Sequence, residues 1–158
     1  MARFKILIVE DSESKLNSIQ AVVERVIPNA YLRKAYSVRS AIDAIEEEPP
    51  DFIIADMSLP TYDIEVRERG GTPRSFGGIE VFETLDRYEM VTPVLVVTSF
   101  PVLSEGSKSL GLVELSKQLR QDFPGNFLDT IYFDSAFSDW ERSIESNLKS
   151  VLEKKNVS

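Results

Sequence analysis

The sequence of 158 residues contains neither cysteine nor histidine. Without cysteine there can be no disulfide, no thiolate metal site and no cysteine nucleophile. Without histidine, imidazole is absent as a base, as a metal ligand and as a phosphoryl carrier. A metal ion bound by these side chains must therefore be a hard cation that prefers oxygen ligands.

Positive charge and long apolar runs are also scarce. The net charge of −8 and the isoelectric point near 4.7 argue against nucleic acid or an anionic membrane as the main partner. No apolar run reaches the length of a membrane span, and the first residues lack the pattern of a signal peptide. We therefore expect a cytoplasmic protein that forms one domain over residues 1–158.

Short apolar runs alternate along the chain with segments of helical periodicity. The runs predict strands at 4–9, 31–36, 52–55, 93–99 and 130–133. Apolar residues at three- and four-residue steps predict helices within 16–26, 38–45, 79–85, 112–119 and 140–152. This alternation is typical of an α/β fold with a parallel sheet covered on both faces. We expect a flavodoxin-like, doubly wound, five-stranded sheet of order 2-1-3-4-5, with the polar strand 31–36 at an edge.

Acidic residues stand where predicted buried strands end. Glu10 and Asp11 follow the first strand, Asp56 follows the third, and Thr98 with Ser99 closes the fourth. Ligands of such sheets bind at the carboxyl ends of the strands, near the point where the strand order reverses. Three converging carboxylates repel one another unless a counter-charge is present, and Mg²⁺ suits an all-oxygen site. In the alternative interpretation, Glu10 and Asp11 cap a helix and Asp56 merely ends a strand.

Five segments, in this order, resemble response regulator receiver domains. They are "ILIVEDSE" (6–13), "DFIIADMSLP" (51–60), "GGIEVFETL" (77–85), "PVLVVTS" (93–99) and the last strand with its aromatic Tyr132. The set covers nearly the whole chain. It is the ordered set, rather than any one segment, that carries the resemblance.

The resemblance implies a role for each matching residue. Asp56 would be the phosphoacceptor, taking a phosphoryl group from a histidine of a kinase or phosphotransfer protein. Thr98 would bond a phosphoryl oxygen, and Tyr132 would be the aromatic that changes rotamer in the active state. The implied Mg²⁺ ligands are Glu10, Asp11, Asp56 and the backbone carbonyl of Ser58. Such a domain is a phosphoacceptor that assists its own phosphorylation and dephosphorylation rather than an enzyme. It would contact a downstream protein through the face of its fourth helix, fifth strand and fifth helix.

One departure from the family concerns a cation. The family has a lysine at the end of the last strand, where this chain has Ser135, and no lysine or arginine lies between Arg120 and Arg142. The region 100–126, around the fourth helix, is also enlarged. Lys108 in that region could reach the site as a substitute, or it could be an ordinary surface lysine.

A second departure is an insertion at 64–77, between the third strand and the third helix. It contains Arg67, Arg69 and Arg74 and several glycines. One of these arginines could fold over the site and replace the missing lysine. Alternatively, the insertion is a mobile surface loop in which acidic residues offset the arginines.

Three functions are compatible with these patterns. The first is a phosphorylatable receiver domain in a phosphorelay. The second is a pseudo-receiver, a protein-interaction module that acts without phosphorylation, which Ser135 favours. The third is a cofactor protein or phosphatase on the same architecture. It is the weakest, because "EDSESK" is unsuited to a flavin phosphate and Ser58 stands where a haloacid dehalogenase phosphatase needs a second aspartate.

Overall fold

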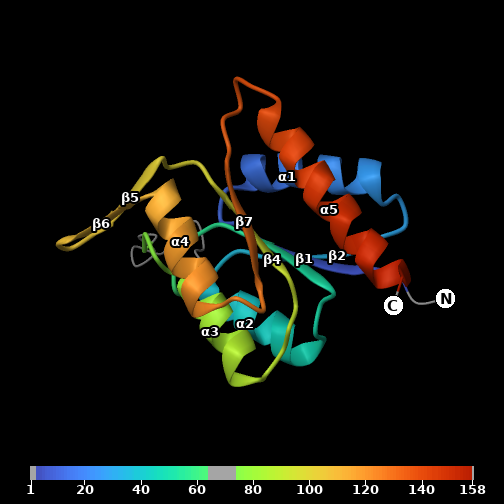
Figure 1. Ribbon diagram of the computed structural model, residues 1–158, viewed down its shortest axis with the longest axis horizontal. Coiled ribbons are helices and arrows are strands. Elements are labelled where there is room, and N and C mark those ends of the chain that lie inside the picture. Colours follow the sequence, from blue (N-terminus) through green and yellow to red (C-terminus); the bar gives the residue numbers. More distant parts are fainter. Residues whose placement is uncertain (1–2, 64–73, 158) are drawn as a thin grey trace.

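The computed structural model describes residues 3–63 and 74–157. A five-stranded parallel sheet of order β2-β1-β3-β4-β7 forms the centre of the molecule (Figure 1). Its strands are β1 (Lys5–Val9), β2 (Tyr31–Ala35), β3 (Phe52–Ala55), β4 (Val94–Thr98) and β7 (Phe127–Tyr132). The predicted order is confirmed, with β7 as the fifth strand of the sheet and β2 at an edge.

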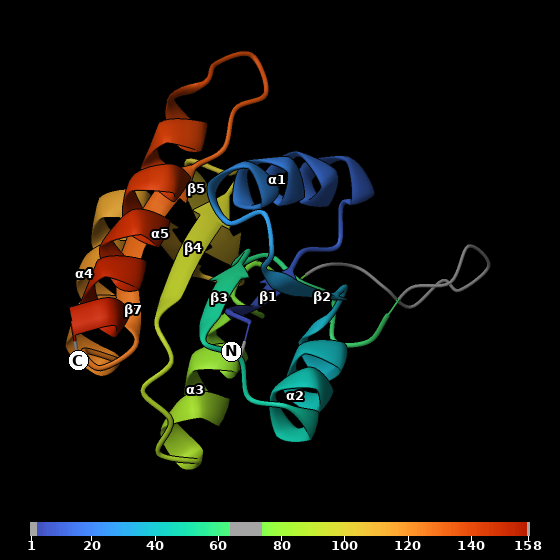
Figure 2. The ribbon, with the colours of Figure 1, turned by 90° about the vertical axis from the view of Figure 1, so that its right-hand side faces the viewer.

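Helices cover both faces of the sheet, as Figures 1 and 2 show. They are α1 (Glu13–Val26), α2 (Val38–Glu47), α3 (Ile79–Arg87), α4 (Leu112–Asp122) and α5 (Asp139–Val157). Helices α1 and α5 pack on one face, and α2, α3 and α4 pack on the other. Among residues 3–63 and 74–157, none of the helices has the length and apolar character that a bilayer span requires.

The strand β1 shows how the sequence divides the core between the two faces. Ile6 and Ile8 point toward α1 and α5, whereas Leu7 and Val9 point toward the opposite helices. Successive side chains of a strand alternate between faces, so a strand in the middle of the sheet is apolar throughout. All four of these side chains are fully buried.

The region 100–126 contains an element that the sequence interpretation missed. Strands β5 (Val102–Glu105) and β6 (Lys108–Gly111) form an antiparallel hairpin apart from the main sheet. The two-residue turn between them contains Gly106, whose φ of 62° is a left-handed conformation that glycine adopts without a steric cost. The expectation of five strands was therefore incomplete. The last sheet strand also begins at Phe127, earlier than the predicted residue 130.

The insertion at 64–77 is described only from residue 74 onward, so Arg67 and Arg69 lie outside the described residues. Its final part is packed. Arg74 and Leu59 exchange backbone hydrogen bonds of 2.9 and 3.0 Å, and the side chain of Phe76 is buried in the core beneath α2, α3 and α4. This segment leads directly into α3 and fixes where that helix begins.

Candidate functional site

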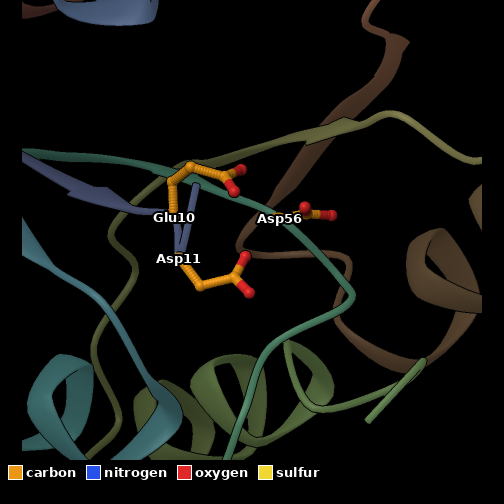
Figure 3. A group of neighbouring side chains, drawn as sticks. All are labelled: Glu10, Asp11 and Asp56. Carbon is orange, nitrogen blue, oxygen red and sulfur yellow. The ribbon is translucent and has the colours of Figure 1, made fainter. Parts of the chain in front are cut away.

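Three carboxylates meet at the carboxyl ends of β1 and β3. Val9 and Ala55 are register partners in the sheet, so the residues that follow them, Glu10 and Asp56, lie side by side. Asp11 completes the group, and one carboxylate oxygen from each residue lies within 4.8 Å of those of the other two. Figure 3 shows the three side chains around a common space. The juxtaposition that the sequence predicted at this edge of the sheet is present.

The carboxylates border a cavity of about 360 Å³. Residues from the ends of β1, β3, β4 and β7 and from the first turns of α1 line it. The lining consists of Glu10, Asp11, Ser12, Ser14, Lys15, Ser18, Asp56, Ser58, Ser99, Phe100, Phe133 and Ser135. The space is large enough for a small anion and a metal ion with its water ligands.

The backbone after β3 holds the Asp56 carboxylate in place. Asp56 Oδ1 accepts hydrogen bonds from the backbone N–H groups of Met57, at 2.6 Å, and Ser58, at 3.2 Å. The N–H of Gly78, at the start of α3, donates to the Met57 carbonyl at 2.8 Å. A Cβ atom on Gly78 would lie 2.4 Å from the Asp56 carbonyl oxygen, so only glycine allows α3 to approach this closely.

A buried lysine of α1 reaches into the acidic cluster, and the sequence interpretation did not identify it. The Nζ atom of Lys15 lies 2.8 Å from Asp56 Oδ2, 2.7 Å from Glu10 Oε1 and 2.8 Å from the Val97 carbonyl oxygen. The ammonium donates hydrogen bonds to Asp56 and to the Val97 carbonyl, and its contact with Glu10 is an ion pair. The side chain is 5% exposed. Lys15 thus supplies the counter-charge that the converging acids require.

The local structure of α1 explains how the Lys15 side chain reaches the acidic cluster. Ser12 caps the helix, and its hydroxyl oxygen accepts a hydrogen bond from the Lys15 N–H at 3.4 Å. Side chains on a helix tilt toward its N-terminus, so a residue in the first turn points back over the strand ends. The sequence does carry a signal for this. Lys15 stands four residues before Ile19 and seven before Val22, on the apolar face of the helix.

Burial dominates the electrostatics of Glu10, whose side chain is 2% exposed. The pKa of Glu10 is raised from 4.5 to about 8, chiefly by desolvation; the Lys15 ammonium acts to lower it, and the Asp56 carboxylate contributes to the rise. Glu10 Oε2 also accepts a hydrogen bond from the Ser12 N–H at 2.9 Å. Glu10 is therefore costly to ionise unless another positive charge enters the cluster.

Asp11 differs from its two neighbours. It is partly exposed, and within residues 3–63 and 74–157 it has no ion pair or side-chain hydrogen bond. An unengaged carboxylate beside two engaged ones is a suitable ligand for a hard divalent cation. Asp11 and Asp56 both line the cavity, as does Ser58, and carboxylate oxygens are donors that a hard divalent cation prefers.

The remaining predicted residues lie around the ends of β4 and β7. Thr98 is fully buried, and its hydroxyl oxygen accepts a hydrogen bond from the Phe100 N–H at 3.3 Å, which leaves the hydroxyl proton free to donate elsewhere. Tyr132 pairs in register with Thr98, but its side chain is 45% exposed. Phe133, the next residue, lines the cavity instead, as does the exposed Ser135.

Neither of the proposed substitute cations that the structure describes lies in the cavity lining. The Lys108 ammonium sits 4.5 Å from the ring centroid of Phe76, on the hairpin. Arg74 forms an ion pair of 2.8 Å with Glu80. The interpretation of Lys108 as a surface lysine agrees with this position.

The comparisons with known proteins agree with the geometry. A family profile described as "Response regulator receiver domain" matches residues 6–116. The Detocs response regulatory protein DtcB of Vibrio alginolyticus is 29% identical over 148 residues, which are 92% of this chain and 99% of that protein. The uncharacterized protein y4jR of Sinorhizobium fredii is 27% identical over 143 residues, 90% of this chain and 95% of that one.

Solved structures support the fold. The structure of the phosphorylated cyanobacterial phytochrome response regulator RcpA superposes with a TM-score of 0.66. The match covers 97% of this chain and 96% of that one, at 18% sequence identity. At this identity the likeness speaks for the architecture, and the site must be argued from its own residues.

Proposed function

This chain belongs to the response regulator receiver domain family, and we propose that Asp56 is the residue that accepts the phosphoryl group. The observation that carries the proposal is the meeting of Glu10, Asp11 and Asp56 within 4.8 Å beside an open cavity. Receiver domains of response regulators bind Mg²⁺ at such an acidic pocket. Here Glu10, Asp11, Asp56 and the Ser58 carbonyl would hold the ion, which would neutralise charge on the transferred group.

The chemistry follows from the position of Asp56. A carboxylate oxygen forms a bond to phosphorus while the bond from phosphorus to the donor histidine nitrogen breaks. The electron pair of the broken bond stays on the imidazole. Catalysis of this step requires positioning and charge stabilisation rather than covalent help. The backbone N–H groups of Met57 and Ser58 orient the nucleophile, and the Thr98 hydroxyl has a proton available for a phosphoryl oxygen.

The partners follow from the family and from the exposed surface. The phosphoryl donor would be a histidine kinase or a phosphotransfer protein, and we place the exchange in the cytoplasm. We assign a downstream protein to the face of α4, β7 and α5; Val113 of α4, Tyr132 of β7 and Phe137 of the loop before α5 are exposed. In this proposal Tyr132 is the switch aromatic, and residues 1–158 act as a single receiver domain. The pseudo-receiver alternative has less support because all three acids are present at the site.

The test is phosphorylation by acetyl phosphate with Mg²⁺, followed by intact mass. We expect wild type to gain one phosphoryl group and Asp56→Asn to gain none, while Asp11→Asn should be modified far more slowly because the metal is held less tightly. Modification that persists in Asp56→Asn would show that the acceptor is another residue. In a parallel Mg²⁺ titration, the amide signals of residues 10–11 and 56–58 should shift.

A further inference from the structure

We propose that Lys15 of α1 is the cation that contacts the phosphoryl group on Asp56, in place of the lysine that this chain lacks at Ser135. The inference rests on the proposed role of Asp56 and adds a residue that the sequence pattern does not assign. In this chain the function of the missing lysine has moved from the end of β7 to the first turn of α1.

The contacts of Lys15 place it at the reacting atoms. Its Nζ atom is 2.8 Å from Asp56 Oδ2, and the side chain is as buried as that of Asp56, each being 5% exposed. Within the part of the chain that the structure describes, Lys15 is the only cation paired with Asp56. At the position where the family has its lysine, Ser135 is exposed and can donate only a neutral hydrogen bond.

The other contacts of the ammonium hold it in place when Asp56 changes. The Val97 carbonyl lies one residue beyond Val96, the last β4 residue that pairs with β3, and Lys15 donates to it at 2.8 Å. Glu10 Oε1 forms an ion pair with the same Nζ atom at 2.7 Å. A charge bound by a carbonyl and a second carboxylate stays at the site after its contact with Asp56 is altered.

Phosphoryl transfer gives this charge a new partner. As a carboxylate oxygen of Asp56 bonds to phosphorus, the bond to the leaving group breaks and its electron pair departs with that group. The carboxylate becomes an acyl phosphate, so the negative charge moves from Asp56 to the phosphoryl oxygens. The ammonium loses its anionic contact at Asp56 and gains a stronger one on the phosphoryl group, which carries about two negative charges. Charge-assisted hydrogen bonds of this kind are the strong ones.

Lys15 does not take the place proposed for the metal. It contacts Asp56 through Oδ2 and lies on the Glu10 side, whereas Asp11 has no partner in the described chain. Asp56 Oδ1 faces the N–H groups of Met57 and Ser58 and is not paired with the ammonium. Glu10 and Asp56 would therefore face both cations, while Asp11 is left for the metal. The charges of Mg²⁺ and of one lysine together balance the three carboxylates.

The experiment compares wild type with Lys15→Met, Lys15→Gln and the double variant Lys15→Met/Ser135→Lys. Lys149→Met, which removes an exposed lysine of α5, is the matched control. Circular dichroism first establishes that each variant is folded. Beryllofluoride, a phosphoryl analogue, is then titrated with Mg²⁺ and followed by NMR at the amides of Thr98 and Ser99. Phosphorylation by acetyl phosphate is followed by intact mass, and Mg²⁺ is titrated alone.

Removal of the Lys15 charge should act in opposite directions on the two ligands. Beryllofluoride affinity and the phosphorylation rate should fall roughly 10- to 100-fold, the value of one charge-assisted hydrogen bond. The affinity for Mg²⁺ alone should rise by about 3- to 10-fold, because a neighbouring positive charge is gone. The double variant should recover part of the beryllofluoride affinity, and Lys149→Met should match wild type. A merely structural loss would weaken both ligands.

The outcomes separate this inference from the proposed function. If wild type neither binds beryllofluoride nor gains a phosphoryl group, the role of Asp56 is wrong. If wild type does both and the folded Lys15 variants match it, the role of Lys15 is wrong. If neither Lys15 variant folds, the role of Lys15 is tested in wild type through the NMR signal of its side-chain ammonium group. That signal should shift when beryllofluoride binds, and an unchanged signal would overturn the inference.

Discussion

The β1–α1 junction (residues 10–15) and the β7–α5 junction (residues 133–138) both border the cavity beside Asp56, and they differ in charge and burial. The first contributes two carboxylates and the buried Lys15 ammonium. The second contributes Phe133 and the exposed Ser135. The Asp134 side chain forms a local hydrogen bond within the second junction: its carboxylate accepts from the Ala136 N–H at 2.9 Å.

This difference between the junctions shows that the cation beside Asp56 need not come from the last strand of the sheet. The site needs a cation beside Asp56, and any element whose side chains reach that point can supply it. Helix α1 starts next to the end of β1 and directs the Lys15 side chain back over the strand ends. The β7–α5 junction itself carries no lysine or arginine. The following predictions test how far the two junctions differ, from the largest expected effect to the smallest.

The largest effect should come from removing the buried charge of the β1–α1 junction. Lys15→Met leaves Glu10 and Asp56 as neighbouring acids without their shared counter-ion. We expect a loss of about 3–5 kcal/mol in the free energy of unfolding at pH 7 without Mg²⁺. Urea denaturation measures it. The exposed Lys149→Met should change stability by less than about 0.5 kcal/mol, and equal effects of the two variants would contradict the assigned burial.

Glu10 should make the stability of the protein depend on pH. Its pKa is raised from 4.5 to about 8 in the folded protein, so the folded state retains a proton that the unfolded chain releases. The stabilising contribution is therefore complete below pH 4.5 and is lost as the pH rises toward 8. At about 1.4 kcal/mol for each unit of pKa shift, the loss amounts to a few kcal/mol.

Urea denaturation at several pH values, with Mg²⁺ absent, isolates this contribution. Glu10→Gln should flatten the pH dependence between 4.5 and 8, whereas Glu13→Gln, at an exposed position just beyond Glu10, should leave it as in wild type. Mg²⁺ should reduce the dependence in wild type because it favours the ionised carboxylate. If the free energy of unfolding of Glu10→Gln still depended on pH between 4.5 and 8 as in wild type, another group would be responsible.

The smallest effects should come from the hydrogen bonds that close each junction. Ser12→Ala removes the cap of α1, and Asp134→Ala removes the acceptor of the Ala136 N–H. Each should cost about 0.5–1 kcal/mol of stability. Only Ser12→Ala should also slow phosphorylation by acetyl phosphate, because Ser12 holds the turn that carries Lys15. If Asp134→Ala slowed phosphorylation as much, the β7–α5 junction would also contribute to phosphoryl transfer.

Much of the architecture could be predicted because local patterns carry it. The apolar runs of β1, β3 and β4 and the helical spacing within α1 and α5 each depend on near neighbours in the chain. The hairpin β5–β6 was missed because its strands are polar and short, and only Leu103 is buried. Its two-residue turn at Gly106 was the one local signal available.

The acids of the site were also predictable, since strand ends and sheet order together place them. Glu10 follows β1 and Asp56 follows β3, and adjacent parallel strands bring their ends to one edge. The roles of Thr98 and Tyr132 stay predictions, as does the carbonyl of Ser58. Ser58 lines the cavity, whereas Thr98 and Tyr132 lie at the adjoining ends of β4 and β7.

The sequence by itself determined the strand order, the two buried faces and the meeting of three carboxylates, because alternation and helical spacing act over a few residues. Only the tertiary structure decided which cation serves them. Lys15 and Asp56 are 41 residues apart, and their contact depends on how α1 packs over the ends of β1, β3 and β4. The lysine on the apolar face of α1 indicated a buried charge, but its partner could be identified only once the helix was placed.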